Sequence, residues 1–135
     1  MRILVTGAAG FLGYAVAALL AEHGHHVIGL TRSPASALPP GVHRLQGDLT
    51  TPATLPATLT DVDGVCHLAG LTRVRDSRTH PVDYWRTNTG GTLAILHRLT
   101  GTQAGRVVLA STCASSTSTS LSHCRRDVPR VPACK

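Results

Sequence analysis

Short, continuous apolar runs recur along the chain and predict the strands of a sheet that is buried on both faces. The first run is Ile3-Leu4-Val5, and others lie within 27–30, 65–68 and 106–110. A further short strand is expected near Val42–Gln46. Uninterrupted apolar runs of this length are typical of parallel strands, because helices cover both faces of a parallel sheet. The pattern therefore predicts about five parallel strands.

Segments with helical periodicity separate these runs. One stripe of the segment that ends near Glu22 is apolar and predicts a helix that packs on the sheet: Leu12, Val16, Leu19 and Leu20. Gly24 follows at the point where a left-handed residue often ends a helix. A second helix is expected from Pro81 to Leu99, and a weaker one at 52–60, where prolines and threonines disfavour it.

Alternating strands and helices predict an α/β protein with a doubly wound parallel sheet of the Rossmann type. The alternation ends after Ala110. Between Ser111 and Ser122, nine of twelve residues are Ser or Thr, without helical or strand periodicity. We expect an incomplete Rossmann-type domain over residues 1–112 and a disordered or frame-shifted tail over 113–135. The strand at 106–110 would then be an exposed apolar edge.

Charge adds to this picture at the C-terminal end. The chain has 135 residues and a formal charge of +6, and residues 111–135 contribute half of it, with four basic residues against Asp127. The charge is therefore no evidence for an anionic polymer as a partner. A small basic cluster at 73–78 is expected in a loop, and the scarcity of aromatic residues argues against nucleic-acid binding.

Other features exclude several classes of protein and site. No apolar run approaches the roughly 20 residues of a membrane span, and the chain opens on a strand, so we expect a cytoplasmic protein without a membrane partner. The four cysteines lack C-x-x-C spacing, and no disulfide framework is expected. The histidines at 23, 25 and 26 are interpreted as solvated residues between a helix and a strand, and no metal site is expected.

Three glycines, Gly7, Gly10 and Gly13, lie between the first strand and the first helix. Glycines in this place let the backbone turn tightly and approach a pyrophosphate, whose charge is stabilised by the amides and the positive end of the helix. A second strand completes the strand–helix–strand unit. This context predicts a dinucleotide-binding loop.

The segment Leu4–Gly13 resembles the opening of the NAD-dependent epimerase/dehydratase family, the extended short-chain dehydrogenase/reductases, which have T-G-x-x-G-[FY]-[IL]-G here. Three further family motifs follow in order: Gly47-Asp48-Leu49, His67-Leu68-Ala69-Gly70 and Asn88-x-x-Gly91-Thr92. The stretch from His67 to Thr92 is particularly similar to nucleotide-sugar epimerases such as the UDP-galactose 4-epimerases. The resemblance covers residues 1–112.

The resemblance implies an oxidoreductase that binds NAD(P) and acts by hydride transfer, often on a nucleotide sugar. Asp48 would accept a hydrogen bond from the adenine amino group, and Leu49 would pack on the ring. Further cofactor contacts are implied for the glycine loop and for the end of the fourth strand: Gly7, Gly10, Phe11, Leu12, Gly13, Leu68, Ala69 and Gly70. His67 is interpreted as a packed core histidine rather than a catalytic base.

Cofactor choice is expected to depend on the end of the second strand. Family members that prefer NAD have an acidic residue there, which binds both ribose hydroxyls. This chain has Thr31-Arg32-Ser33 instead. An arginine suits a 2′-phosphate, so NADP is favoured over NAD, and a solvated Arg32 at the start of a loop is the alternative.

The family's catalytic residues are a Ser or Thr after the last of these strands and a Tyr-x-x-x-Lys pair on the next helix. Thr112 aligns with the hydroxyl. Asn88 is assigned to the hydrogen-bond network of the active site, on a helical stripe that faces the sheet. The only lysine, Lys135, has Val131 four residues before it, so the pair is absent and is expected just past the last residue.

This absence suggests a truncated or frame-shifted reading of an epimerase/dehydratase-like gene, with a small-molecule substrate only in a full-length form. Two alternatives remain at this point. One is an NADP-binding sensor or regulator that turns nothing over, and the other is a non-functional fragment.

Overall fold

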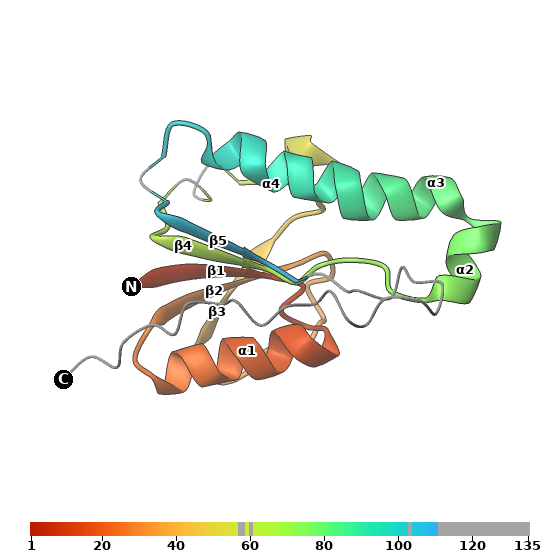
Figure 1. Ribbon diagram of the computed structural model, residues 1–135. Coiled ribbons are helices and arrows are strands. Elements are labelled where there is room, and N and C mark those ends of the chain that lie inside the picture. Colours follow the sequence, from red (N-terminus) through yellow and green to blue (C-terminus); the bar gives the residue numbers. More distant parts are fainter. Residues whose placement is uncertain (57–58, 60, 103, 111–135) are drawn as a thin grey trace, which may run out of the picture.

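A five-stranded parallel sheet forms the centre of the protein (Figure 1). The computed structural model describes residues 1–56, 59, 61–102 and 104–110. The strands are β1 (Arg2–Thr6), β2 (His26–Thr31), β3 (Val42–Gln46), β4 (Gly64–His67) and β5 (Arg106–Leu109). Their order is β3-β2-β1-β4-β5, and neighbouring strands are parallel. The order confirms the predicted Rossmann-type fold, with its switch point between β1 and β4.

Helices cover both faces of this sheet (Figure 1). Helix α1 (Phe11–Glu22) lies on one face, and α3 (Pro81–Tyr84) and α4 (Gly91–Leu99) lie on the other. A π-helical turn, Trp85–Gly90, joins α3 to α4. The predicted helix from Pro81 to Leu99 is therefore confirmed in extent, with a wider turn in its middle.

Two local expectations are wrong. The basic cluster does not lie in a loop, because Arg75 and Arg78 belong to a short helix, α2 (Val74–Thr79). Asp76 in its first turn and Arg78 in its last turn interact favourably with the helix dipole and so support this helix. The weaker helix expected at 52–60 is reduced, among the described residues, to a 3-10 turn over Pro52–Thr54, an extended Leu55 and a 3-10 residue at Leu59, as its prolines would favour.

The hydrophobic core consists of two clusters, one on each side of the sheet. Successive residues of β1 enter opposite clusters: Leu4 faces α4 and Val5 faces α1, and both are fully buried. This alternation follows from the two-residue period of a strand, and it makes β1 apolar throughout. Ala94 and Ile95 contribute α4 to the first cluster, and Ala17 contributes α1 to the second.

The stripe of α1 that contacts the sheet differs from the predicted one. Leu12 and Leu19 are 52% and 56% exposed, whereas Gly13 and Ala17 are buried. The reason is the close approach of α1 to the loop before it, since a Cβ on Gly13 would overlap the carbonyl oxygen of Gly7. Only glycine fits at position 13. Of the predicted stripe, Leu12 and Leu19 turn outward, whereas Leu20 packs against the second core cluster as predicted.

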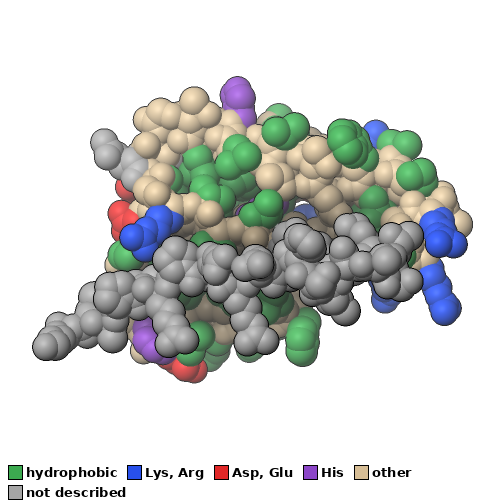
Figure 2. All heavy atoms as spheres, viewed as in Figure 1, with side chains coloured by type: hydrophobic (Ala, Val, Ile, Leu, Met, Phe, Trp, Pro, Cys, Tyr) green, Lys and Arg blue, Asp and Glu red, His purple; other side chains and the backbone are tan. Residues whose placement is uncertain are grey.

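Apolar side chains also remain at the surface of the described structure. Within it, β5 is an edge strand, and 58% of Val108 is exposed, which agrees with the expected apolar edge. Figure 2 shows further hydrophobic side chains along the α3–α4 side. The exposed large apolar residues of α3, the π-helical turn and α4 are Val82, Trp85, Leu93 and Leu96. Among the described residues, no helix has the length and apolar character to cross a membrane.

The burial of α4 gives a direct test of the fold. Ile95→Ala removes a side chain that is 2% exposed, and we expect it to lower the free energy of unfolding by about 2–5 kcal/mol. The neighbouring Leu96→Ala is the matched control, since Leu96 is 45% exposed and its loss should cost less than about 1 kcal/mol. Urea denaturation of both variants measures the difference, and equal losses would contradict the placement of α4.

Candidate functional site

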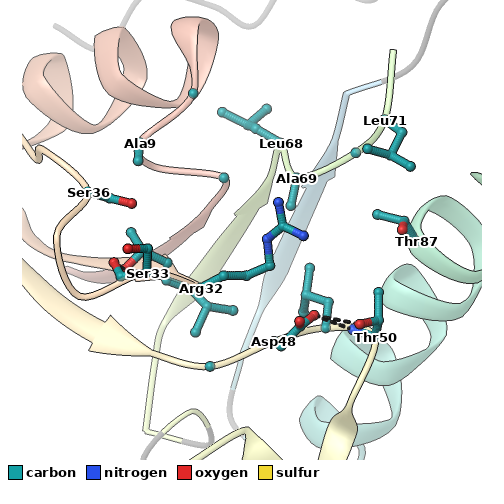
Figure 3. A pocket seen from close by; sticks show the side chains of 17 residues that line it. Ala9, Arg32, Ser33, Ser36, Asp48, Thr50, Leu68, Ala69, Leu71 and Thr87 are labelled. Atoms are coloured by element: carbon teal, nitrogen blue, oxygen red, sulfur yellow. Dashed lines mark hydrogen bonds between the residues drawn. The ribbon is translucent and has the colours of Figure 1, made fainter. Parts of the chain in front are cut away.

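A cavity of about 330 Å³ lies at the carboxyl ends of the strands (Figure 3). In an open parallel sheet this edge is where ligands bind, at the point where the chain reverses the direction of its crossovers. Four segments that follow β1, β2, β3 and β4 form the wall together with the π-helical turn. Eight of the residues predicted to contact a cofactor line it: Gly7, Gly10, Arg32, Asp48, Leu49, Leu68, Ala69 and Gly70.

The other predicted residues lie elsewhere. Phe11, Leu12 and Gly13 do not line the cavity: Phe11 is fully exposed, and Gly13 packs α1 against the loop. Asn88 is not a lining residue either, although Thr87 beside it is. Thr112 lies outside the described residues.

Sequence reasoning missed part of the wall. The missed side chains include Ser33, Ser36, Thr50, Leu71 and Thr87. Each of them lies within four residues of a predicted position, so extending each motif along the loop after its strand would have found most of them. The physical signal is that the carboxyl ends of parallel strands meet at one edge.

The glycine loop brings two stretches of backbone into close approach. Gly7 has φ +69°, a left-handed conformation that favours glycine. A Cβ there would also lie 2.8 Å from the backbone nitrogen of Ala69, so no larger residue fits. The N–H of Gly10 donates to the Gly7 carbonyl at 2.8 Å and closes the turn. A side chain at Gly7 therefore has no room in this loop.

The N-terminus of α1 opens directly from this loop. Gly10 is its N-cap residue and provides no side-chain cap, and the first turn contains no acidic residue. The first amides of a helix lack partners within the helix and carry a partial positive charge. Because Gly10 lines the cavity, these amides can take an anion such as a pyrophosphate.

Asp48 occupies the opposite wall, in the segment after β3. Its Oδ1 accepts hydrogen bonds from the backbone nitrogen and the hydroxyl of Thr50, both at 2.8 Å (Figure 3). Burial alone raises the pKa of Asp48, but these two bonds and the charge of Arg32 outweigh it and hold the pKa below its usual value. Asp48 is thus an ionised acceptor, and the two bonds leave its Oδ2 for a further donor.

A buried hydrogen-bond chain fixes the end of β4. The backbone N–H groups of Leu68 and Ala69 both donate to Oγ1 of Thr6, each at 3.1 Å. The Thr6 oxygen has no lone pair left, so its proton is donated to Nδ1 of His67 at 2.7 Å. His67 is therefore neutral, with its proton on Nε2.

The hydrogen-bond chain continues from His67 to the π-helical turn. Nε2 of His67 donates to Oγ1 of Thr92 at 3.1 Å, and the Thr92 hydroxyl donates to the carbonyl of Asn88 at 2.6 Å. His67 is buried and paired at both nitrogens, as expected of a packed core histidine. The two threonine hydroxyls thus connect β1, β4 and the helical layer through one imidazole.

Asn88 differs from the expectation that it points toward the sheet. Its side chain is exposed and bridges the backbone of Leu71, accepting from the nitrogen at 2.7 Å and donating to the oxygen at 2.9 Å. The π-helical turn contains more residues than an α-helical turn, so the predicted stripe does not hold there. The bridge holds the segment after β4 beside the cavity.

His67 makes the stability of the chain depend on pH. Burial lowers the pKa of His67 from its ordinary value of 6.5, so the unfolded chain binds the proton more readily than the folded chain. The free energy of unfolding is therefore highest above about pH 6.5 and falls as the pH drops toward the lowered pKa. The lowered pKa of Asp48 affects the free energy of unfolding only below about its ordinary pKa of 3.8, which lies outside this pH range.

Urea denaturation between about pH 5 and 8 measures this dependence. We expect His67→Gln to remove most of the slope, whatever its effect on stability at pH 8. His97→Gln, at an exposed position of α4, is the control and should retain the slope. An unchanged slope in His67→Gln would show that the hydrogen-bond chain does not hold His67 neutral.

Comparison with known proteins agrees with this geometry. Residues 3–120 match the model of the NAD dependent epimerase/dehydratase family. A UDP-glucose 4-epimerase of Streptomyces lividans is 33% identical over 84% of this chain and 36% of its own length. The corresponding protein of Azospirillum brasilense is 33% identical over 97% of this chain and 39% of its own length.

Solved structures show the same likeness. The UDP-glucose 4-epimerase of Thermus thermophilus in complex with NAD has a TM-score of 0.75 and 29% identity, over 83% of this chain and 38% of that one. The enzyme of Bifidobacterium longum, in complex with NAD+ and UDP, has a TM-score of 0.72 and 26% identity, over 84% and 37%. This chain spans less than half the length of these relatives. The family match over most of the chain shows that it belongs to the NAD dependent epimerase/dehydratase family.

Proposed function

We propose that the cavity binds a nicotinamide dinucleotide, and that residues 1–112 are the cofactor-binding domain of an oxidoreductase of the epimerase/dehydratase type. The observation that carries this proposal is the cradle at Gly7, where a Cβ would meet the backbone of Ala69 while the uncapped start of α1 faces the same cavity. A cradle without side chains, next to free amides, fits a pyrophosphate.

The wall residues suggest how the parts of the cofactor are held. The amides of the first turn of α1, after Gly10, would hold the pyrophosphate. The free Oδ2 of Asp48 would accept a hydrogen bond from the adenine amino group, with Leu49 against the ring. Leu68, Ala69 and Gly70 would line the remainder of the dinucleotide, and the Asn88 bridge to Leu71 would keep that wall in place.

NADP is the preferred cofactor in this proposal. The guanidinium of Arg32 extends into the cavity, and Ser33 and Ser36 lie on the same wall (Figure 3). A guanidinium and nearby hydroxyls suit a 2′-phosphate, whereas an NAD-selecting carboxylate at this place is missing. NAD would then bind the same cavity with lower affinity.

The reaction we propose is hydride transfer involving a small molecule, with a nucleotide sugar as the first candidate. The bound dinucleotide would supply the carbon that accepts or donates the hydride. Thr112 would provide a hydroxyl at the reacting end. Both solved relatives described above are UDP-glucose 4-epimerases, and the B. longum structure contains UDP, which supports this substrate class.

A second candidate is a module that binds NADP without turnover. It is favoured by the lack of a Tyr-x-x-x-Lys pair in these 135 residues. Tyrosine and lysine in that pattern would hold and move the proton that accompanies the hydride. Incubating the chain with NADP or NAD and UDP-glucose discriminates the two candidates. Conversion of UDP-glucose to its 4-epimer supports the enzyme, and so does growth of reduced-nicotinamide absorbance. Both are needed, because an epimerase returns the hydride to the sugar and accumulates no reduced cofactor. Nucleotide binding with neither signal supports the module.

Gly10→Ala tests the cradle. Gly10 has φ −81°, which alanine accepts, and a Cβ there would lie 3.1 Å from the carbonyl oxygen of Gly7. A small shift of the loop relieves this contact, so the fold should survive while the added methyl narrows the place of the pyrophosphate. We expect the affinity for NADP and NAD to fall by about tenfold or more, which corresponds to about 1.4 kcal/mol. Isothermal titration measures both affinities.

Gly90→Ala is the matched control for this substitution. A Cβ at Gly90 meets nothing within 4 Å, its φ is −60°, and Gly90 does not line the cavity. Its affinity should equal that of the parent chain. Equal affinities for Gly10→Ala and Gly90→Ala would place the nucleotide elsewhere and overturn the proposed function.

A further inference from the structure

The connection between β2 and β3 is held by an arginine from the edge strand β3. Nη1 of Arg44 donates to Oγ1 of Thr31 at 3.2 Å and to the carbonyl of Ser33 at 3.3 Å. Nη2 donates to the carbonyl of Ser36 at 2.5 Å. One planar guanidinium therefore ties together the end of β2 and both serines of the cavity wall.

A second side chain of β3 reinforces this contact. Nε2 of Gln46 donates to the carbonyl of Arg32 at 3.4 Å. Gln46 is two residues beyond Arg44, so both project from the same face of β3. The carbonyls of Arg32, Ser33 and Ser36 thus accept donors from β3, while the side chains of these residues line the cavity.

The charge of this region is one-sided. Between Glu22 and Asp48 the sequence contains no acidic residue, and its two arginines are Arg32 and Arg44. Backbone carbonyl oxygens carry partial negative charge and would repel an anion here. Side chains of β3 donate hydrogen bonds to three of these carbonyls. The wall therefore offers a phosphate the charge of Arg32 and the serine side chains, and those carbonyls are already hydrogen-bonded to β3.

We infer that Arg44 is a positioning residue for cofactor selection, which shapes the Thr31–Ser36 segment so that it receives the 2′-phosphate of NADP. This inference rests on the proposed function, since it assumes that the cavity takes a nicotinamide dinucleotide. Arg44 acts through Arg32, Ser33 and Ser36. Its effect falls on the 2′-phosphate, because the pyrophosphate and adenine are held by the glycine loop and by the segment after β3.

Two substitutions separate the geometry of Arg44 from its charge. Arg44→Met removes both, and Arg44→Lys keeps the charge but replaces the planar fork with a single ammonium that cannot hold acceptors on three residues at once. Arg75→Met is the control, because Arg75 is exposed on α2 and its loss lowers the net charge of the chain by the same amount. Arg44 is itself exposed on an edge strand, so these variants should fold.

The experiment titrates NADP and NAD into the full 135-residue chain and each variant, and compares the ratio of the two affinities. We expect Arg44→Met to weaken NADP by about tenfold and NAD by less than about threefold. Arg44→Lys should recover only part of the NADP affinity, and Arg75→Met should leave the ratio unchanged. Backbone amides of Ser33, Ala35 and Ser36 should exchange hydrogen faster in both Arg44 variants, which a role in charge alone would not produce.

The outcomes distinguish this inference from the function on which it rests. An unchanged affinity ratio in Arg44→Met overturns the inference and leaves the proposed function intact. Full NADP affinity in Arg44→Lys would also overturn the inference, because charge alone would then explain the effect. The same holds if Arg75→Met changes the affinity ratio as much as Arg44→Met does. If the parent chain binds neither nucleotide, the proposed function fails and this inference fails with it.

Discussion

The cavity depends on one close approach between two stretches of backbone. Gly7 and Ala69 come together at the carboxyl ends of β1 and β4, where even a methyl group on Gly7 would lie 2.8 Å from the nitrogen of Ala69. The hydroxyl of Thr6 accepts the N–H groups of Leu68 and Ala69 and so holds the two segments at this distance. A larger residue at Gly7 would separate β1 from the segment after β4 and displace the start of α1.

Polar side chains hold the remaining walls of the cavity from outside it. On one side, His67 and Thr92 connect the Thr6 contact to the π-helical turn, and Asn88 in that turn bridges Leu71. On the other side, Arg44 holds the Thr31–Ser36 segment. Loops that would otherwise be free to move are thereby fixed by neighbouring secondary structure, as pre-organised binding requires.

The sequence predicted the fold and the glycine loop because both depend on local patterns. A buried parallel strand must be apolar throughout, as Leu4 and Val5 show, and Gly7 must adopt a left-handed conformation. The contact face of α1 could not be predicted in this way. Hydrophobicity favoured Leu12 and Leu19, but the short distance between α1 and its own loop admits only glycine at position 13, and Ala17 is the fully buried residue one turn further on. Distance between elements is not encoded in the period of a helix.

By itself, the sequence determined the order of strands and helices, the family, and eight residues of the cavity wall, since motifs at the ends of parallel strands are brought to one edge by topology. Only the tertiary structure decided how that wall is held. The contact between Arg44 and Ser36 and the chain from Thr6 through His67 to Thr92 join residues on different elements. Each depends on where neighbouring strands place their side chains, and no local pattern contains that information.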